Sequence, residues 1–82
     1  MHEMSLCESI LRILEKQAEK EGFQRVLKVK ILIGEHAGAS EESLAFCFPF
    51  VTKGTLAEGA ALEFNRTKGC DLKVDELDVE EE

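Results

Sequence analysis

Hydrophobic residues in the first quarter of the chain recur at the spacing of an amphipathic helix, at Leu6, Ile10, Ile13, Leu14 and Ala18. Charged residues occupy the opposite face, as in a helix packed on a core. Ser5 and Glu8 form the pattern of a capping box, in which each side chain accepts a hydrogen bond from a free backbone N–H. Gly22 then stands where helices commonly end. The pattern predicts a helix over about residues 6–21.

The periodicity changes to that of a strand after Gln24. Apolar residues alternate with Lys28 and Lys30, at Leu27, Val29, Ile31 and Ile33. Such alternation predicts a strand with one buried face. A loop bracketed by Gly34 and Gly38 follows.

A second helical stretch is predicted to begin at Ser40. Glu41 and Glu42 follow it directly, where carboxylates favour the positive end of a helix dipole. The expected buried side carries Leu44, Phe48 and Val51, and residues 53–54 (Lys-Gly) close the stretch. Pro49 lacks a backbone N–H and crowds the preceding turn, so we expect a kink or an early end there.

Two further strands are predicted, over residues 60–64 and 72–79, with a turn at 65–69. In the last strand the apolar phase changes at Asp75 and Glu76, which indicates one extra residue and therefore a β-bulge. The element order is thus α-β-α-β-β. We expect an α+β fold in which two helices pack on one face of a three-stranded sheet.

Composition narrows the class of protein. The 82 residues allow one small domain, and 44% hydrophobic with 33% charged residues is typical of a globular chain. A formal net charge of −7 and scattered basic residues argue against a nucleic-acid partner. No apolar run is long enough to cross a membrane, and the start lacks the features of a signal peptide. We therefore expect a cytoplasmic protein with no membrane partner.

The cysteines and acidic residues offer little catalytic chemistry. Cys7, Cys47 and Cys70 are odd in number and form no C-x-x-C pair, so neither a disulfide framework nor a zinc site is indicated. We expect Cys7 and Cys47 to be buried small hydrophobes, and Cys70 to lie at the edge of a turn. The many carboxylates are best explained as solvated faces, and no phosphate-binding loop occurs. Nothing here indicates an enzyme.

The most distinctive candidate site is the first three residues, Met1, His2 and Glu3. A terminal amine, backbone amides and the His2 imidazole can form fused chelate rings on one metal ion, and Glu3 can add another donor. Such nitrogen-rich, planar coordination suits Ni(II) or Cu(II). The alternative is a merely exposed histidine, which on composition alone is the commoner case. His36, in the glycine-bracketed loop, is expected to face solvent, although it also offers a donor.

These residues resemble those of the HypA/HybF family of hydrogenase nickel-incorporation proteins. The similarity is carried by residues 1–6 (Met-His-Glu-Met-Ser-Leu), Ile33-Gly34, 44–48 (Leu-Ala-Phe-Cys-Phe), 51–60 (Val-Thr-Lys-Gly-Thr-Leu-Ala-Glu-Gly-Ala) and Leu72, Val74, Leu77 and Val79. The resemblance implies a metallochaperone that binds Ni(II) through Met1, His2 and Glu3. With a HypB-type GTPase it would pass nickel to the large subunit of [NiFe]-hydrogenase, and in some bacteria to urease.

One departure from the family accompanies the match. Family members carry a zinc domain with two C-x-x-C pairs, inserted between the last two strands, and this chain lacks it between about residues 64 and 71. We therefore expect residues 1–82 to form a single nickel-binding domain without structural zinc. The short connection that remains is of hairpin length, so we expect the last two strands to be neighbours.

Two other interpretations stay open. The chain is also compatible with a metal-independent module that docks on the maturation GTPase through a helix face or an exposed strand edge. Exchange of a strand between two copies would in addition give a swapped homodimer.

Overall fold

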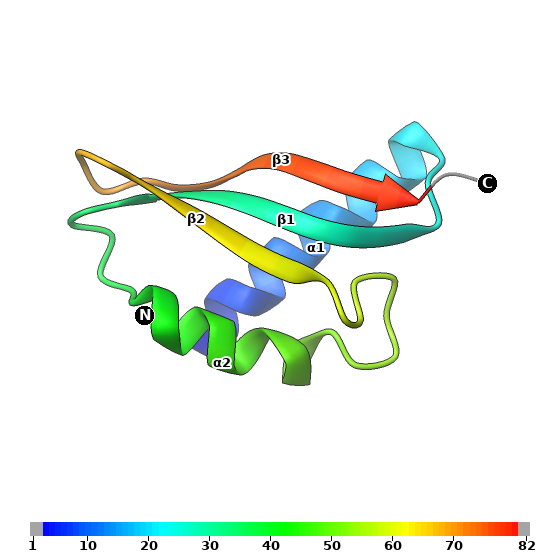
Figure 1. Cartoon of the computed structure of the whole chain (residues 1–82), viewed down its shortest axis with the longest axis horizontal. Coiled ribbons are helices and arrows are strands. Elements are labelled where there is room, and N and C mark those ends of the chain that lie inside the picture. The colour runs from blue at the N-terminus through cyan, green and yellow to red at the C-terminus, as the bar shows by residue number, and fades with distance from the viewer. Residues whose placement is uncertain (1–2, 81–82) are drawn as a thin grey trace.

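The computed structural model of the protein describes residues 3–80. They form two helices and three strands in the predicted order, α1 (Glu3–Glu21), β1 (Arg25–Gly34), α2 (Glu41–Val51), β2 (Ala61–Thr67) and β3 (Leu72–Glu80). The strands make one sheet, and both helices lie on the same face of it (Figure 1). The predicted two-layer α+β architecture is confirmed.

The strand order is β2-β1-β3, with β1 parallel to β2 and antiparallel to β3. The hairpin expected between the last two strands is therefore wrong. Residues 52–60 carry the chain from α2 back to the start of β1, so β2 runs beside β1 in the same direction. This leaves the opposite edge of β1 for β3, and the β2–β3 connection crosses the end of β1 (Figure 1).

Backbone hydrogen bonds hold this crossing connection in place. The Gly34 N–H donates to the Asp71 carbonyl at 2.7 Å, the Glu35 N–H to Thr67 at 2.9 Å, and the His36 N–H to Gly69 at 2.8 Å. A Cβ at position 34 would lie 2.5 Å from the Gly69 carbonyl oxygen. Only glycine at the end of β1 allows the connection to pass this closely.

The core lies between the helices and the sheet. Its fully buried side chains come from every layer, among them Cys7, Ile10 and Leu14 of α1, Val26, Val29, Ile31 and Ile33 of β1, and Leu44 and Phe48 of α2. The Cys7 thiol donates to the Leu44 carbonyl oxygen at 3.6 Å, which joins the first turns of the two helices. Burial of Cys7 was expected for a small hydrophobe.

The start of α1 differs from the sequence prediction. The helix begins at Glu3, so Ser5 and Glu8 lie inside it and the predicted capping box does not form. Cys7 lies on the same buried stripe as Ile10 and Leu14, and packing of this stripe, rather than a local cap, stabilises the first turns of the helix.

Two side chains predicted for the core are exposed instead. Ile13 is 44% and Leu27 51% exposed. Leu27 turns outward because the β1–β3 register shifts between Val26 and Lys28, which changes the face that the following residues occupy. The predicted bulge in β3 is confirmed, since Lys30 pairs with Glu76 and Ile31 with Val74, leaving Asp75 as the extra residue.

Helix α2 begins as predicted, with the Ser40 hydroxyl accepting a hydrogen bond from the Ser43 N–H at 2.9 Å. It does not end at Pro49 but continues to Val51, two residues short of the predicted close at residues 53–54. Pro49 lies in the last turn, where a missing N–H costs one hydrogen bond and interrupts little. Thr52 caps the end by donating its backbone N–H to the Phe48 carbonyl.

Candidate functional site

The predicted metal ligands are Met1, His2 and Glu3, and α1 begins at the last of these. Met1, His2 and the side chain of Glu3 are outside the described part of the structure, and Glu3 is the first helical residue. The first turn of α1 packs against the start of α2, as the Cys7–Leu44 hydrogen bond shows. The start of α1 therefore lies beside the start of α2.

The start of a helix offers free backbone N–H groups and a positive electrostatic potential. The first four backbone N–H groups of a helix have no intrahelical acceptor, so the Glu3 amide is free to bind a ligand. The positive end of the helix dipole opposes a cation but favours deprotonation of nearby groups. Amide nitrogens that lose their protons carry negative charge, which the positive end of the dipole stabilises.

His36, the other histidine of the chain, lies in the loop after β1 and is exposed, as expected. Its backbone N–H binds the β2–β3 connection, so its position follows from the crossing over Gly34. Between residues 3 and 80, no three side chains of His, Cys, Asp or Glu come together in a way that could hold a metal ion.

The three cysteines form no disulfide and lie in three different environments. Cys7 is buried, as predicted, and Cys70 is exposed in the connection between β2 and β3. Cys47 is only partly buried, which corrects the expectation of a core position. It lies on the side of α2 rather than on the stripe that contains Leu44 and Phe48, so part of its surface stays open to solvent.

The outer face of the sheet carries an ion-pair network. Lys28 Nζ lies 3.1 Å from a Glu63 carboxylate oxygen and 3.9 Å from Asp78, while Lys30 lies 3.2 Å from Glu76. The hydrogen bond and charge of Glu76, followed by the charge of Glu63, raise the pKa of Lys30 above its ordinary value. These carboxylates belong to a solvated face, as expected.

Two exposed phenylalanines were missed by the sequence prediction. Phe46 and Phe50 are 70% and 65% exposed on the outer side of α2, with ring centroids 5.6 Å apart. Their spacing of four residues on a helix, offset from Leu44 and Phe48, is the signal that identifies them. We call this pair the aromatic face.

The Val-Thr-Lys-Gly-Thr segment has a structural role. The buried Thr52 hydroxyl donates to the Phe48 carbonyl at 2.9 Å, and the Thr55 hydroxyl donates to the Thr52 carbonyl at 2.6 Å. Gly54, at a φ of 79°, supplies the left-handed residue that the turn requires. The segment ends α2 and returns the chain to the sheet.

The family model for "Hydrogenase/urease nickel incorporation, metallochaperone, hypA" matches residues 1–77. The chain belongs to this HypA family. Hydrogenase maturation factor HypA of Acidithiobacillus ferrooxidans is 54% identical over 63 residues, which cover 77% of this chain and 56% of that protein. HypA of Azotobacter chroococcum is 51% identical over 69 residues, 84% of this chain and 61% of that protein. The matched residues thus span somewhat more than half the length of these relatives.

A solved structure supports the fold independently. The solution structure of the Ni metallochaperone HypA from Helicobacter pylori matches with a TM-score of 0.85, covers 100% of both chains and is 16% identical. The family membership suggested by the sequence is confirmed, and so is the fold. No helix between residues 3 and 80 is long and apolar enough to cross a membrane.

Proposed function

We propose that this HypA chain is a nickel metallochaperone module, which binds Ni(II) through Met1, His2 and Glu3. It would deliver the metal, with a HypB-type GTPase, to the large subunit of [NiFe]-hydrogenase in the cytoplasm, and in some organisms to urease. The observation that carries this proposal is the nickel-incorporation family match, which begins at residue 1 and so includes the candidate ligands. Nickel is the cargo, and no catalytic role is proposed.

The donor set fits the cargo. The Met1 amine, the His2 amide and imidazole, and the Glu3 amide or carboxylate offer nitrogen-rich ligands of the kind that planar Ni(II) prefers. The start of α1 at Glu3 supports this set, because the amide there is not committed to an intrahelical hydrogen bond. Binding releases protons from imidazole and amides, so affinity is expected to rise with pH.

Nickel titration followed by calorimetry and by absorption spectroscopy tests the ligand set. Protein with its native start is expected to show one saturable site, which His2→Ala abolishes. His36→Ala is the matched control, because it removes an exposed histidine from a loop and leaves the first residues intact. Adding residues ahead of Met1 removes the amine donor and is expected to abolish the site as well. Unchanged nickel uptake in both His2→Ala and the extended protein would refute the proposed site.

A second function, metal-independent docking on the GTPase, is favoured by the aromatic face. Phe46 and Phe50 expose apolar rings that a partner would cover, and such exposed patches commonly mark interaction sites. The Cys7–Leu44 contact places α2 beside the start of α1, so a partner that covers α2 would lie near the start of α1. Docking and delivery are thus compatible.

Capture by the purified GTPase in metal-free buffer distinguishes the two functions. Phe46→Ala with Phe50→Ala is expected to reduce capture, whereas His2→Ala is expected to leave it intact. Leu27→Ala is the matched control, since it removes an apolar side chain that is also exposed, at 51%, but lies on the sheet. Equal capture of all variants would show that the partner docks elsewhere.

The β2–β3 connection is where we place the missing zinc module. It occupies residues 68–71 and crosses the end of β1. Elemental analysis is expected to find no zinc in the purified protein. The proposed swapped homodimer requires this connection to release Gly34 and exchange β3, and light scattering over a concentration series would detect it.

A further inference from the structure

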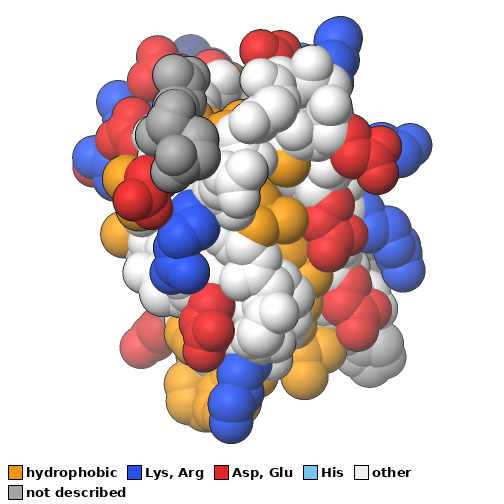
Figure 2. Space-filling view, turned by 90° about the vertical axis from the view of Figure 1, so that its right-hand side faces the viewer, with side chains coloured by type: hydrophobic (Ala, Val, Ile, Leu, Met, Phe, Trp, Pro, Cys, Tyr) orange, Lys and Arg blue, Asp and Glu red, His pale blue; other side chains and the backbone are white. Residues whose placement is uncertain are grey.

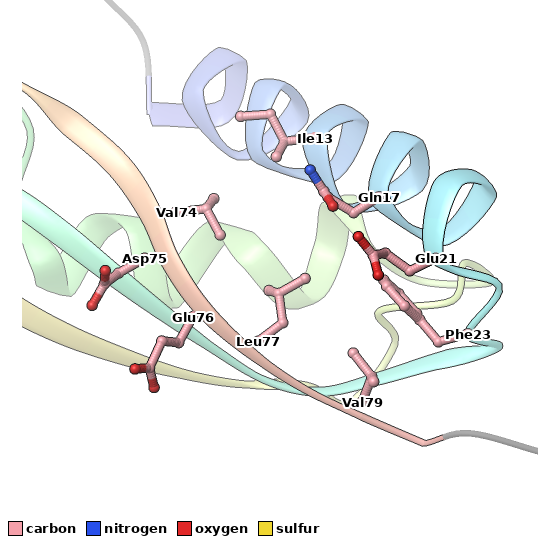
Figure 3. Close-up of a pocket in the computed structure, with 9 residues that line it drawn as sticks. All are labelled: Ile13, Gln17, Glu21, Phe23, Val74, Asp75, Glu76, Leu77 and Val79. Carbon is pink, nitrogen blue, oxygen red and sulfur yellow. The ribbon is translucent and has the colours of Figure 1, made fainter.

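A groove lies between α1 and β3 (Figure 3). It is an open hollow of about 390 Å³. From α1, the side chains of Ile13, Gln17 and Glu21 point towards the strand, and Leu77 and Val79 line the opposite side. The groove therefore follows the strand over three successive turns of the helix.

The apolar floor of this groove is incompletely covered. Ile13 is 44% exposed, and Leu77 and Val79 of β3 are only half-buried. A strip of hydrophobic side chains is visible between the sheet and α1 (Figure 2). The last turns of α1 extend beyond β3 in Figure 1, so the sheet is too narrow to cover the helix. A further strand beside β3 would lie over this flank.

The outer edge of β3 is available for such a strand. In the order β2-β1-β3, this strand pairs with β1 along one edge and with no described strand along the other. The bulge at Asp75 interrupts the edge, so the regular part is residues 76–80. Free backbone groups on a strand edge are the main source of affinity when an extended peptide adds to a sheet.

Charge decides between a second copy of this chain and a different partner. Strand β3 is acidic. It carries one lysine, Lys73, and the carboxylates of Asp75, Glu76, Asp78 and Glu80. Antiparallel pairing of two β3 strands would bring these like charges together, which is unfavourable. A strand with basic side chains is complementary in charge to β3. The pairing of β1 with β3 already shows this, because Lys30 of β1 lies 3.2 Å from Glu76 of β3.

We propose that the groove binds an extended segment of another protein, with alternating basic and apolar residues, as a fourth strand beside β3. The apolar side chains of the segment would cover Ile13, Leu77 and Val79, and its basic side chains, on the opposite face of the strand, would face the exposed carboxylates of β3. Backbone hydrogen bonds to residues 76–80 would complete the sheet. This surface is independent of the nickel ligands, so it stands or falls separately from the proposed cargo site.

The probe is an acetylated and amidated heptapeptide of alternating lysine and valine, titrated into ¹⁵N-labelled protein and followed by NMR. Saturable shifts are expected in the amides of residues 76–80 and of α1 around Ile13 and Gln17. The same peptide with glutamate in place of lysine is expected not to bind. A version with N-methyl groups on alternate amides loses backbone donors and is expected not to bind either. Retained binding of the N-methylated peptide would overturn the strand-addition geometry.

Variants locate the site with little risk to folding. Ile13→Lys is expected to weaken binding about tenfold, because it places a charge on the apolar floor. The matched control Leu27→Lys, at a similarly exposed position on β1, is expected to have no effect. Glu80→Lys is expected to weaken binding about two- to fivefold, because it reverses one charge on the exposed face of β3, with Glu35→Lys as its control.

Two outcomes would overturn the proposal. One is the absence of saturable shifts, or shifts that lie outside the groove. The other is a dimer in sedimentation experiments that Ile13→Lys dissociates, which would show that a second copy of the chain occupies the groove.

Discussion

Substitution of Gly34 by alanine directly tests the crossing at the end of β1. The new methyl group would meet the Gly69 carbonyl oxygen at 2.5 Å, the Gly69 carbonyl carbon at 2.8 Å and the Asp71 nitrogen at 3.0 Å. These atoms are backbone, so the β2–β3 connection must move away. Overpacking of this kind costs about 1–3 kcal/mol. Loss of one of the hydrogen bonds donated by Gly34, Glu35 and His36, as the connection moves, adds about 0.5–1.5 kcal/mol.

The sign of the effect is diagnostic. In a strand without this contact, glycine to alanine would stabilise the protein by about 0.5–1 kcal/mol. We expect instead a loss of about 2–4 kcal/mol, which is a large part of the stability of a small domain. The contacts at position 34 therefore predict destabilisation where strand propensity predicts stabilisation.

Urea unfolding followed by circular dichroism measures this change. Gly59→Ala is the matched control: position 59 has a φ of 80° and nothing within 4 Å of its added Cβ, so it reports backbone strain alone. Gly34→Ala is expected to cost more than Gly59→Ala and to speed hydrogen exchange at residues 34–36. An unchanged or increased unfolding midpoint for Gly34→Ala would refute the reasoning.

Three further predictions concern single side chains. Thr52→Val is expected to lower the free energy of unfolding by about 1 kcal/mol, measured in urea, because the buried hydroxyl no longer donates to the Phe48 carbonyl. A hydrogen bond and ion pairing, chiefly with Glu76, raise the pKa of Lys30 above 10.5 in the folded protein. The contribution of Lys30 to the free energy of unfolding is therefore complete below pH 10.5, and it is lost as the pH rises through the pKa of the folded protein. Lys30→Met is expected to flatten the alkaline fall of the urea midpoint, whereas Lys53→Met is expected to leave that slope unchanged. A thiol reagent is expected to label exposed Cys70 first and buried Cys7 only on unfolding, and early Cys7 labelling would contradict the packing described.

The proposed metal ligands could be predicted from the sequence, whereas two surfaces of the fold could not. A run such as Met-His-Glu carries its chelating groups on consecutive residues, so the proposed ligand set is readable without tertiary structure. The aromatic face was missed because Phe46 and Phe50 are as hydrophobic as the buried Phe48. Only the packing direction of α2 distinguishes them. The β3 groove was missed because it joins α1 to a strand from the other end of the chain.

Local interactions determined the elements of this protein. Helical and strand periodicities, the Ser40 cap and the phase change at Asp75 depend on residues close in sequence, and they predicted the element order, the start of α2 and the β3 bulge correctly. They placed Ile13 and Leu27 in the core wrongly. Tertiary structure decided the rest. The parallel pairing of β2 with β1 depends on where α2 returns the chain, and the outward position of Leu27 depends on its register with β3. Gly34 shows the reason: its role is set by backbone atoms of Gly69, which no local pattern brings into contact.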